Sequence, residues 1–369
     1  MRSAIIALSV LTVVVIGTGV IILAGGGHGH IATDILVTRY DAGSAEIWNV
    51  TIDSGKDDYA TSVIQTSDGG YAVAGWAADY PVSSHRLRVV RLDGTGKTVW
   101  DRTLDGPDVY SADIAEAPDG GFFVAANNNN FDSGTLWKID ASGSAGWNRT
   151  TASAYKAIVP LRDGGFVLAG NPTFILDKNG TTKRQLRIPS TTVLPAAGGT
   201  LYLGQSGVPY IDASVYHIDE NGTVIWALPV GSRESGSIAS MQENAEGDLE
   251  VLYTFRDSKK DKNLVIYMES DLVTVDMGGN ISGRMPLAAV DPVCRTSDGG
   301  YAFLAYPFPD TAAFTNNPYA GSSLHMVLLS PGGTVVRDTP VPHLPAWIAP
   351  RQIIQTRDGG FLTVIVTGS

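Results

Sequence analysis

The sequence contains a single cysteine, Cys294, among 369 residues. One thiol excludes an intramolecular disulfide and any metal cluster that several cysteines would hold. The fold must therefore be stabilised by packing alone. Basic residues are also scarce, because 26 Lys and Arg stand against 37 Asp and Glu, which gives a formal net charge of -11. This acidic balance argues against nucleic acid as a partner.

Familiar catalytic motifs are missing as well. The chain has no G-x-S-x-G, H-E-x-x-H or phosphate-binding glycine loop. Its histidines show no metal-ligand spacing, so we expect neither a metal nor a cofactor. Asn127–Asn130 with Asp132 has the composition of a calcium loop but lacks a downstream bidentate Glu. A polar turn is the favoured interpretation of that segment.

One long apolar segment stands at the N-terminus. Ala4 to Ala24 carries no charge, and about 20 apolar residues cross a bilayer, whereas the apolar part of a cleaved signal has about 7–15. Arg2 is the only charge before Asp34, which places the amino end in the cytoplasm. We predict a cytoplasmic tip (1–3), a transmembrane helix (4–24), a Gly-rich linker (25–33) and an extracellular remainder. Cleavage after Ala24 would instead give a secreted protein.

A turn of the type Asp-Gly-Gly recurs along the chain. Around its first copy, residues 63–66 and 71–76 favour strands, and Ser67 to Gly70 supplies turn chemistry. With this one included, the chain has five full and two degenerate copies at an average spacing of about 48 residues. The copies lie at Asp68, Asp119, Asp163, Ala197–Gly199, Glu246–Asp248, Asp298 and Asp358.

A second hairpin alternates with the first. Its turn has Asp followed three residues later by Gly, and a Trp often stands seven residues after the Asp. The clear copies are 93–100, 140–147 and 219–226, the weaker ones are 41–48, 177–184 and 330–337, and the copy at 276–283 is blurred. Trp48, Trp100, Trp147 and Trp226 are equivalent by position, so we expect them to pack between neighbouring repeats.

Two hairpins per repeat give four strands, and repeated four-stranded units of this length are propeller blades. The sequence therefore predicts an all-β fold, a seven-bladed β-propeller of antiparallel blades over residues 34–369. The series begins with one hairpin type at Ile35 to Ile52 and ends with the other at Gln352 to Val366. We predict that these two hairpins join in one blade and close the ring, which leaves no open sheet edge.

The repeats resemble the Asp-Gly-Gly propellers of archaeal and bacterial cell-surface proteins, within the wider group of quinoprotein-like and WD40-like propellers. The resemblance covers residues 34–369 and concerns the fold. The quinoprotein-type repeat has one more residue between Asp and Trp. Proteins with that repeat also tend to use cysteines and a calcium site that this chain lacks.

Variable loops on a rigid scaffold are the usual place for function. The turns inside the hairpins are short, whereas the links between hairpins and between blades are long and varied. Residues 307–323 form the longest link, which is either a ligand platform or a packed lid over the channel. The candidate ligand-binding residues on it are Phe308, Asp310, Phe314, Asn316 and Tyr319.

Five Asn-x-Ser/Thr sequons suit a glycosylated outer surface, although chance occurrence is the alternative. They begin at Asn49, Asn148, Asn179, Asn221 and Asn280.

Two functions fit these features. The first is a membrane-tethered, non-catalytic binding or scaffolding propeller whose loop-rich side takes a surface protein or a glycan. The second is an extracytoplasmic enzyme, either a quinoprotein-like oxidoreductase or a glycan-active hydrolase or lyase. Carboxylates contributed by several blades would leave no motif, so the side chains at the channel mouth must decide between the two.

Overall fold

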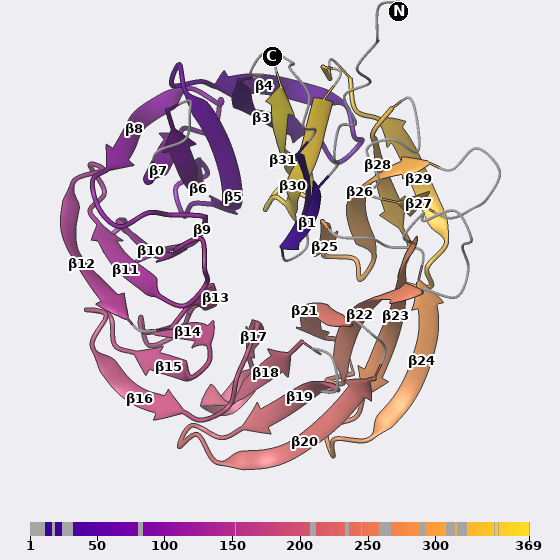
Figure 1. The fold of residues 1–369 in the computed structure, drawn as a ribbon. Coiled ribbons are helices and arrows are strands. Elements are labelled where there is room, and N and C mark those ends of the chain that lie inside the picture. The colour runs from indigo at the N-terminus through magenta and orange to yellow at the C-terminus, as the bar shows by residue number, and fades with distance from the viewer. Residues whose placement is uncertain are drawn as a thin grey trace, which may run out of the picture.

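A computed structural model of the chain describes residues 12–16, 19–23, 32–79, 84–151, 153–206, 212–232, 236–244, 246–257, 267–287, 292–307, 314–315, 323–342, 344–345 and 347–368. Within these residues, seven sheets of antiparallel strands form a ring around a central axis, which is the axis of the predicted channel (Figure 1). The predicted seven-bladed propeller of four-stranded blades is therefore confirmed. In the blade that contains β26, the short strand β27 (Phe314–Thr315) adds to one edge.

The four main strands of each blade follow one another from the channel outward. From the innermost to the outermost strand, the blades are β5 (Asp57–Gln65), β6 (Tyr71–Ala78), β7 (His85–Leu92) and β8 (Thr98–Leu104); β9 (Ser111–Glu116), β10 (Phe122–Asn127), β11 (Gly134–Ile139) and β12 (Ala145–Thr151); β13 (Tyr155–Pro160), β14 (Phe166–Gly170), β15 (Thr173–Leu176) and β16 (Thr182–Leu186); β17 (Thr192–Pro195), β18 (Leu201–Gln205), β19 (Ala213–Ile218) and β20 (Val224–Gly231); β21 (Ser237–Glu243), β22 (Leu249–Asp257), β23 (Tyr267–Val275) and β24 (Ile281–Leu287); β25 (Val293–Arg295), β26 (Tyr301–Pro307), β28 (His325–Leu329) and β29 (Val335–Pro340); and β30 (Trp347–Gln355), β31 (Phe361–Gly368), β3 (Thr33–Tyr40) and β4 (Glu46–Ile52).

Both ends of the chain build the last of these blades, as predicted. The third strand, β3, pairs with β31 along its whole length, from Thr33 opposite Gly368 to Tyr40 opposite Phe361. Ile35 also pairs with Ile52 on β4, so two hairpins that lie far apart in the sequence form one sheet. The closed ring removes the unpaired strand edges that a linear row of blades would have.

The cores lie between the blades. The middle strands are apolar on both faces because each face packs against a neighbouring blade, and all six residues of β10 are buried. Phe123 on β10 lies 4.4 Å, ring centre to ring centre, from Phe166 in the next blade. Seven clusters of buried side chains of this kind stabilise the described part of the ring.

The four tryptophans pack between blades, as expected. The indole Nε1 of Trp100 donates to the carbonyl of Ala141 in the following blade at 3.0 Å, and the ring covers Gly143. Trp48, Trp147 and Trp226 lie in the same way over Gly96, Gly180 and Gly279. Two blades have Arg instead of Trp at this position, and the carbonyls of Glu220 and Ala42 accept hydrogen bonds from Arg184 and Arg337, respectively, each at 3.1 Å.

One repeat differs by a single residue from its predicted alignment. In the full copies, the residue two before the Asp bonds back across the turn, as Thr66 does with Gly70. In the blade of β17 to β20, the equivalent bond joins Ala196 to Thr200. Gly198, and not Ala197, therefore takes the place of the Asp, within the 3-10 turn η1 (Ala197–Gly199).

The N-terminal segment shows two short strands, β1 (Thr12–Ile16) and β2 (Gly19–Leu23), paired antiparallel. The structure has, within the residues it describes, no helix that is long and apolar enough to span a membrane. The transmembrane helix expected over 4–24 is therefore not confirmed. Runs of Val and Ile favour strands in water, whereas a bilayer would require the same run to satisfy its backbone as a helix.

Candidate functional site

The propeller has two different rims. The turns inside the hairpins form the short-turn rim, and the links between hairpins and between blades form the loop-rich rim. Of the residues proposed as a ligand platform on the loop-rich rim, Phe308, Asp310, Asn316 and Tyr319 lie outside the described residues. Phe314 lies on β27, but its side chain is outside the description. That prediction stays untested, and the candidate site comprises other residues of the same rim.

A β-bulge recurs in the innermost strands. In four blades, the pairing of the innermost strand with its neighbour skips one residue. A bulge leaves the extra residue unpaired and re-aims its side chain. The innermost strand of each blade is the edge strand beside the channel. The four bulges therefore change the direction of side chains in the channel wall. The unpaired residues are Thr61, Lys156, Ala239 and Arg351.

Arg351 is the charged residue of the bulge in β30. Its guanidinium carbon lies 4.0 Å from the centre of the Tyr59 ring on the adjacent blade, a cation–π contact. Its Nε is shielded from solvent, and no described group accepts a hydrogen bond from it. Burial lowers the pKa of Arg351 to about 10, so the side chain still carries its positive charge at neutral pH.

Rings from separate segments continue from Arg351 around the mouth. Tyr59 stacks on Trp76 with the planes 6° apart and the centres 4.9 Å apart. His85 meets Trp76 edge-on at 4.5 Å and then Tyr110 at 6.0 Å, and Tyr110 meets Phe131 at 5.8 Å. These five partly buried rings, Tyr59, Trp76, His85, Tyr110 and Phe131, form the aromatic arc.

A second cation ends the arc. The Nζ of Lys156 lies 4.9 Å from the centre of the Phe131 ring. The residue is exposed, and partial desolvation by the neighbouring protein lowers its pKa. Lys156 occupies the bulge of β13, the same place that Arg351 takes in β30. The two blades are three steps apart in a ring of seven, so the two cations stand on nearly opposite sides of the channel.

Hydroxyl groups line the part of the mouth beyond Lys156. Thr191 Oγ1 and Ser206 Oγ are 2.8 Å apart, and Ser206 Oγ lies 3.0 Å from Ser237 Oγ on the next blade. Deeper in the wall, the Asp113 carboxylate accepts from Ser62 Oγ at 2.6 Å and from the Ile158 amide at 2.8 Å. Burial raises the pKa of Asp113. These bonds join three successive blades and give Asp113 a structural role.

Three carboxylates gather elsewhere on the loop-rich rim. One oxygen from each of Asp34, Asp53 and Asp58 lies within 4.8 Å of the others. Asp58 is fully buried, but it accepts hydrogen bonds from Ser54 and forms a 2.5 Å ion pair with Arg88. Sequence reasoning missed this cluster because its members lie on two blades. The hydrogen bonds and the ion pair of Asp58 indicate that the cluster is a structural contact between two blades, in which Arg88 neutralises the Asp58 charge.

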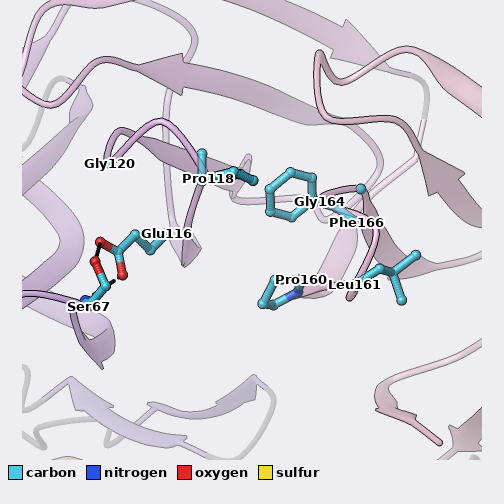
Figure 2. Close-up of a pocket in the computed structure, with 10 residues that line it drawn as sticks. Ser67, Glu116, Pro118, Gly120, Pro160, Leu161, Gly164 and Phe166 are labelled. Carbon is cyan, nitrogen blue, oxygen red and sulfur yellow. Dashed lines mark hydrogen bonds between the residues drawn. The ribbon is translucent and has the colours of Figure 1, made fainter. Parts of the chain in front are cut away.

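Two hollows lie among the described residues of the short-turn rim. One of about 290 Å³ lies between two blades and is lined by Pro118, Pro160, Leu161 and Phe166, with the Ser67–Glu116 hydrogen bonds at its side (Figure 2). The other, of about 780 Å³, lies beside Trp48. Its charged residues already have partners, since Arg39 bonds Asp358 and Asp68 accepts from Arg91, each at 2.6 Å. Arg357 donates to the carbonyls of Thr66 and Ser67. Both hollows therefore belong to the contacts between blades.

The sequon residues are exposed, as glycosylation requires. Asn49 and Asn148 lie on the outermost strands β4 and β12. The other three lie in hairpin turns of the short-turn rim, away from the aromatic arc. Their modification stays a prediction.

Known proteins resemble this chain in fold and not in sequence. No family model matches it, and no curated protein matches it significantly. The solved structure of Sqt1 from Chaetomium thermophilum aligns with a TM-score of 0.50 at 12% identity, over 85% of this chain and 97% of that one. The Dos1 propeller aligns at 0.45 and 11%, over 90% and 73%. A protein of unknown function from Bacteroides caccae aligns at 0.42 and 12%, over 69% and 94%. The Sqt1 alignment supports the propeller fold alone.

Proposed function

We propose that this protein is a membrane-tethered, extracellular β-propeller that binds a ligand at its loop-rich channel mouth without transforming it. One observation carries the proposal, namely that the aromatic arc and the two bulge cations converge on that mouth from four blades. Ligand sites are typically apolar and aromatic, with a few polar groups that fix orientation. The propeller supplies the rigid frame that such a site needs, in keeping with the surface-protein propellers that the repeats resemble.

The ligand is proposed to be a glycan or an exposed surface protein, and binding can be tested on a glycan array with the full-length protein in detergent. Tyr110→Ser removes one ring of the arc, so a bound glycan should lose about tenfold in affinity, or about 1.4 kcal/mol. Val336→Ala, an exposed change on the outermost strand β29, is the matched control. Equal binding by both variants, or binding of no glycan, would contradict the proposal.

The tether and the location rest on the uncharged run at 4–24. We expect intact protein in the membrane fraction and release of the propeller by protease added outside the cell. A soluble mature protein that begins near Gly25 would show instead that the segment is a cleaved signal.

The enzymatic alternative is favoured by one feature, the cluster of Asp34, Asp53 and Asp58. Burial first, and then the charges of Asp53 and Asp58, raise the pKa of Asp34, as in many acid–base sites. Two results would support this alternative if Asp34→Asn abolished them. One is release of reducing ends from glycans, and the other is reduction of a redox dye that requires both an added quinone cofactor and an oxidisable substrate as the electron source.

A further inference from the structure

Arg351 is half-buried and differs from the buried arginines of the described structure in having no acidic partner. Arg39 bonds Asp358 at 2.6 Å, Arg88 forms ion pairs with Asp58 and Asp101, and Arg91 bonds Asp68. The chain has 37 carboxylates for 26 Lys and Arg, so partners are plentiful. Among the described residues, however, no carboxylate pairs with Arg351 and none pairs with Lys156.

An unpaired cation in such surroundings is costly. Removing a charge from water without a partner is strongly unfavourable, and the cost appears as a shift in pKa. Desolvation lowers the pKa of the half-buried Arg351, with no carboxylate to oppose the shift. It also lowers the pKa of Lys156, although that residue is largely exposed, so the cost falls mainly on Arg351. The rings of Tyr59 and Phe131 offset a part of this cost, but they do not neutralise the charge.

Both cations also occupy the same special backbone position. Each stands at the bulge of an innermost strand, where Thr61 and Ala239 occupy the equivalent places in two other blades. A threonine or an alanine is therefore sufficient to form this β-bulge. The positive charges of Arg351 and Lys156 therefore have no structural function that the described contacts explain.

We propose that the loop-rich channel mouth binds an anionic ligand, whose carboxylate or phosphate group pairs with Arg351, while Lys156 attracts the ligand's negative charge from the far side of the mouth. A planar guanidinium donates two parallel hydrogen bonds to such a group. The aromatic arc places partly buried, weakly polar rings beside Arg351, and a charge pair is stronger in such surroundings than in water. This inference rests on the proposed binding role of the mouth and specifies the ligand as anionic.

Thermal denaturation of the full-length protein in detergent, without and with added anions, tests the proposal. Arg351→Met keeps the length of the side chain and removes the charge. Without anions, we expect this variant to melt at the same temperature as the wild type or higher, because a half-buried charge without an acidic partner is lost. The control is Arg88→Met, which leaves Asp58 buried without its partner and should lower the melting temperature by several degrees.

The anion series uses galacturonate, inorganic phosphate and neutral galactose at equal ionic strength. Galacturonate or phosphate should raise the melting temperature of the wild type, Arg351→Met should abolish the rise, and Lys156→Met should reduce it. A rise with galacturonate alone identifies a carboxylate, and a rise with phosphate alone identifies a phosphate group. Galactose should have no effect.

Three results would overturn the proposal. They are a loss of stability in Arg351→Met as large as in Arg88→Met, no anion-dependent rise in the wild type, and an equal rise in Arg351→Met. Failure of the proposed function would appear separately, as unchanged glycan binding by Tyr110→Ser. Isolated anions could still bind in that case, so the two outcomes can be told apart.

Discussion

The contact between each tryptophan and the following blade can be tested with a pair of glycines. Gly143 and Gly69 both have a positive φ, +86° and +88°. A Cβ atom on Gly143 would lie 2.7 Å from the Trp100 indole, whereas a Cβ on Gly69 would meet nothing within 4 Å. Alanine at either site has the same backbone strain, but only Gly143→Ala also pushes against a ring that is 6% exposed.

The expected magnitudes follow from this difference. A left-handed conformation costs a residue with a Cβ about 1–2 kcal/mol, which is the whole effect expected for Gly69→Ala. Overpacking adds about 1–3 kcal/mol, so Gly143→Ala should lose about 2–5 kcal/mol in total. At about 2 °C per kcal/mol for a domain of this size, the two variants should differ in melting temperature by about 2–6 °C.

Thermal denaturation followed by circular dichroism measures both variants against the wild type. A third variant combines Gly143→Ala with Trp100→Leu. Because the smaller side chain relieves the overlap, the two changes should cost less together than the sum of their separate effects. Equal melting temperatures for Gly69→Ala and Gly143→Ala, or strict additivity in the double variant, would refute the role given to Trp100.

Two further predictions concern closure of the ring and its response to acid. Deleting the chain from Thr356 onward removes β31, so the protein should unfold or aggregate, which gel filtration would show. Val364→Asp in the buried strand should have the same effect, whereas Thr51→Asp on the exposed edge should not. A soluble truncation with an unchanged melting temperature would show that the ring closes another way. Bonds from the hydroxyls of Thr66, Thr296 and Thr356 are the main cause of the lowered pKa values of Asp68, Asp298 and Asp358. The stability that these three ionised carboxylates contribute should be complete above their ordinary pKa of 3.8 and lost as the pH falls through the lowered pKa values. A variant with all three threonines changed to Val lacks this contribution. Its melting temperature should therefore decline less steeply below about pH 4 than that of the wild type.

The sequence predicted the architecture well because its information is local and repeated. An Asp that bonds its own backbone and a Gly at positive φ define each turn within five residues, and seven copies determine the number of blades. Closure followed from the order of the two hairpin types. The exception at Gly198 arose where the Asp is missing and two neighbouring glycines allow the turn to shift by one residue.

The candidate site was much less accessible to sequence reasoning. A bulge depends on how two strands meet beside the channel, and no residue pattern in β30 announces it. The aromatic arc combines rings from β5, β6, β7 and two links, so its members share no spacing. One signal was present, since Lys156 and Arg351 each stand seven residues before the Asp of their turn. It becomes meaningful only when the repeats are aligned from the structure.

The blade that both ends build also decides which way the channel opens. Strand β3 begins at Thr33, opposite Gly368, and this end of the strand lies on the loop-rich rim. If residues 4–24 span the bilayer as proposed, the segment from 25 to 32 reaches at most about 30 Å when fully extended. The loop-rich rim, with Arg351 and the aromatic arc, would then face the membrane and not the medium. Whatever reaches them would have to enter a narrow gap above the lipid surface, which favours flexible, slender envelope molecules over bulky soluble ones.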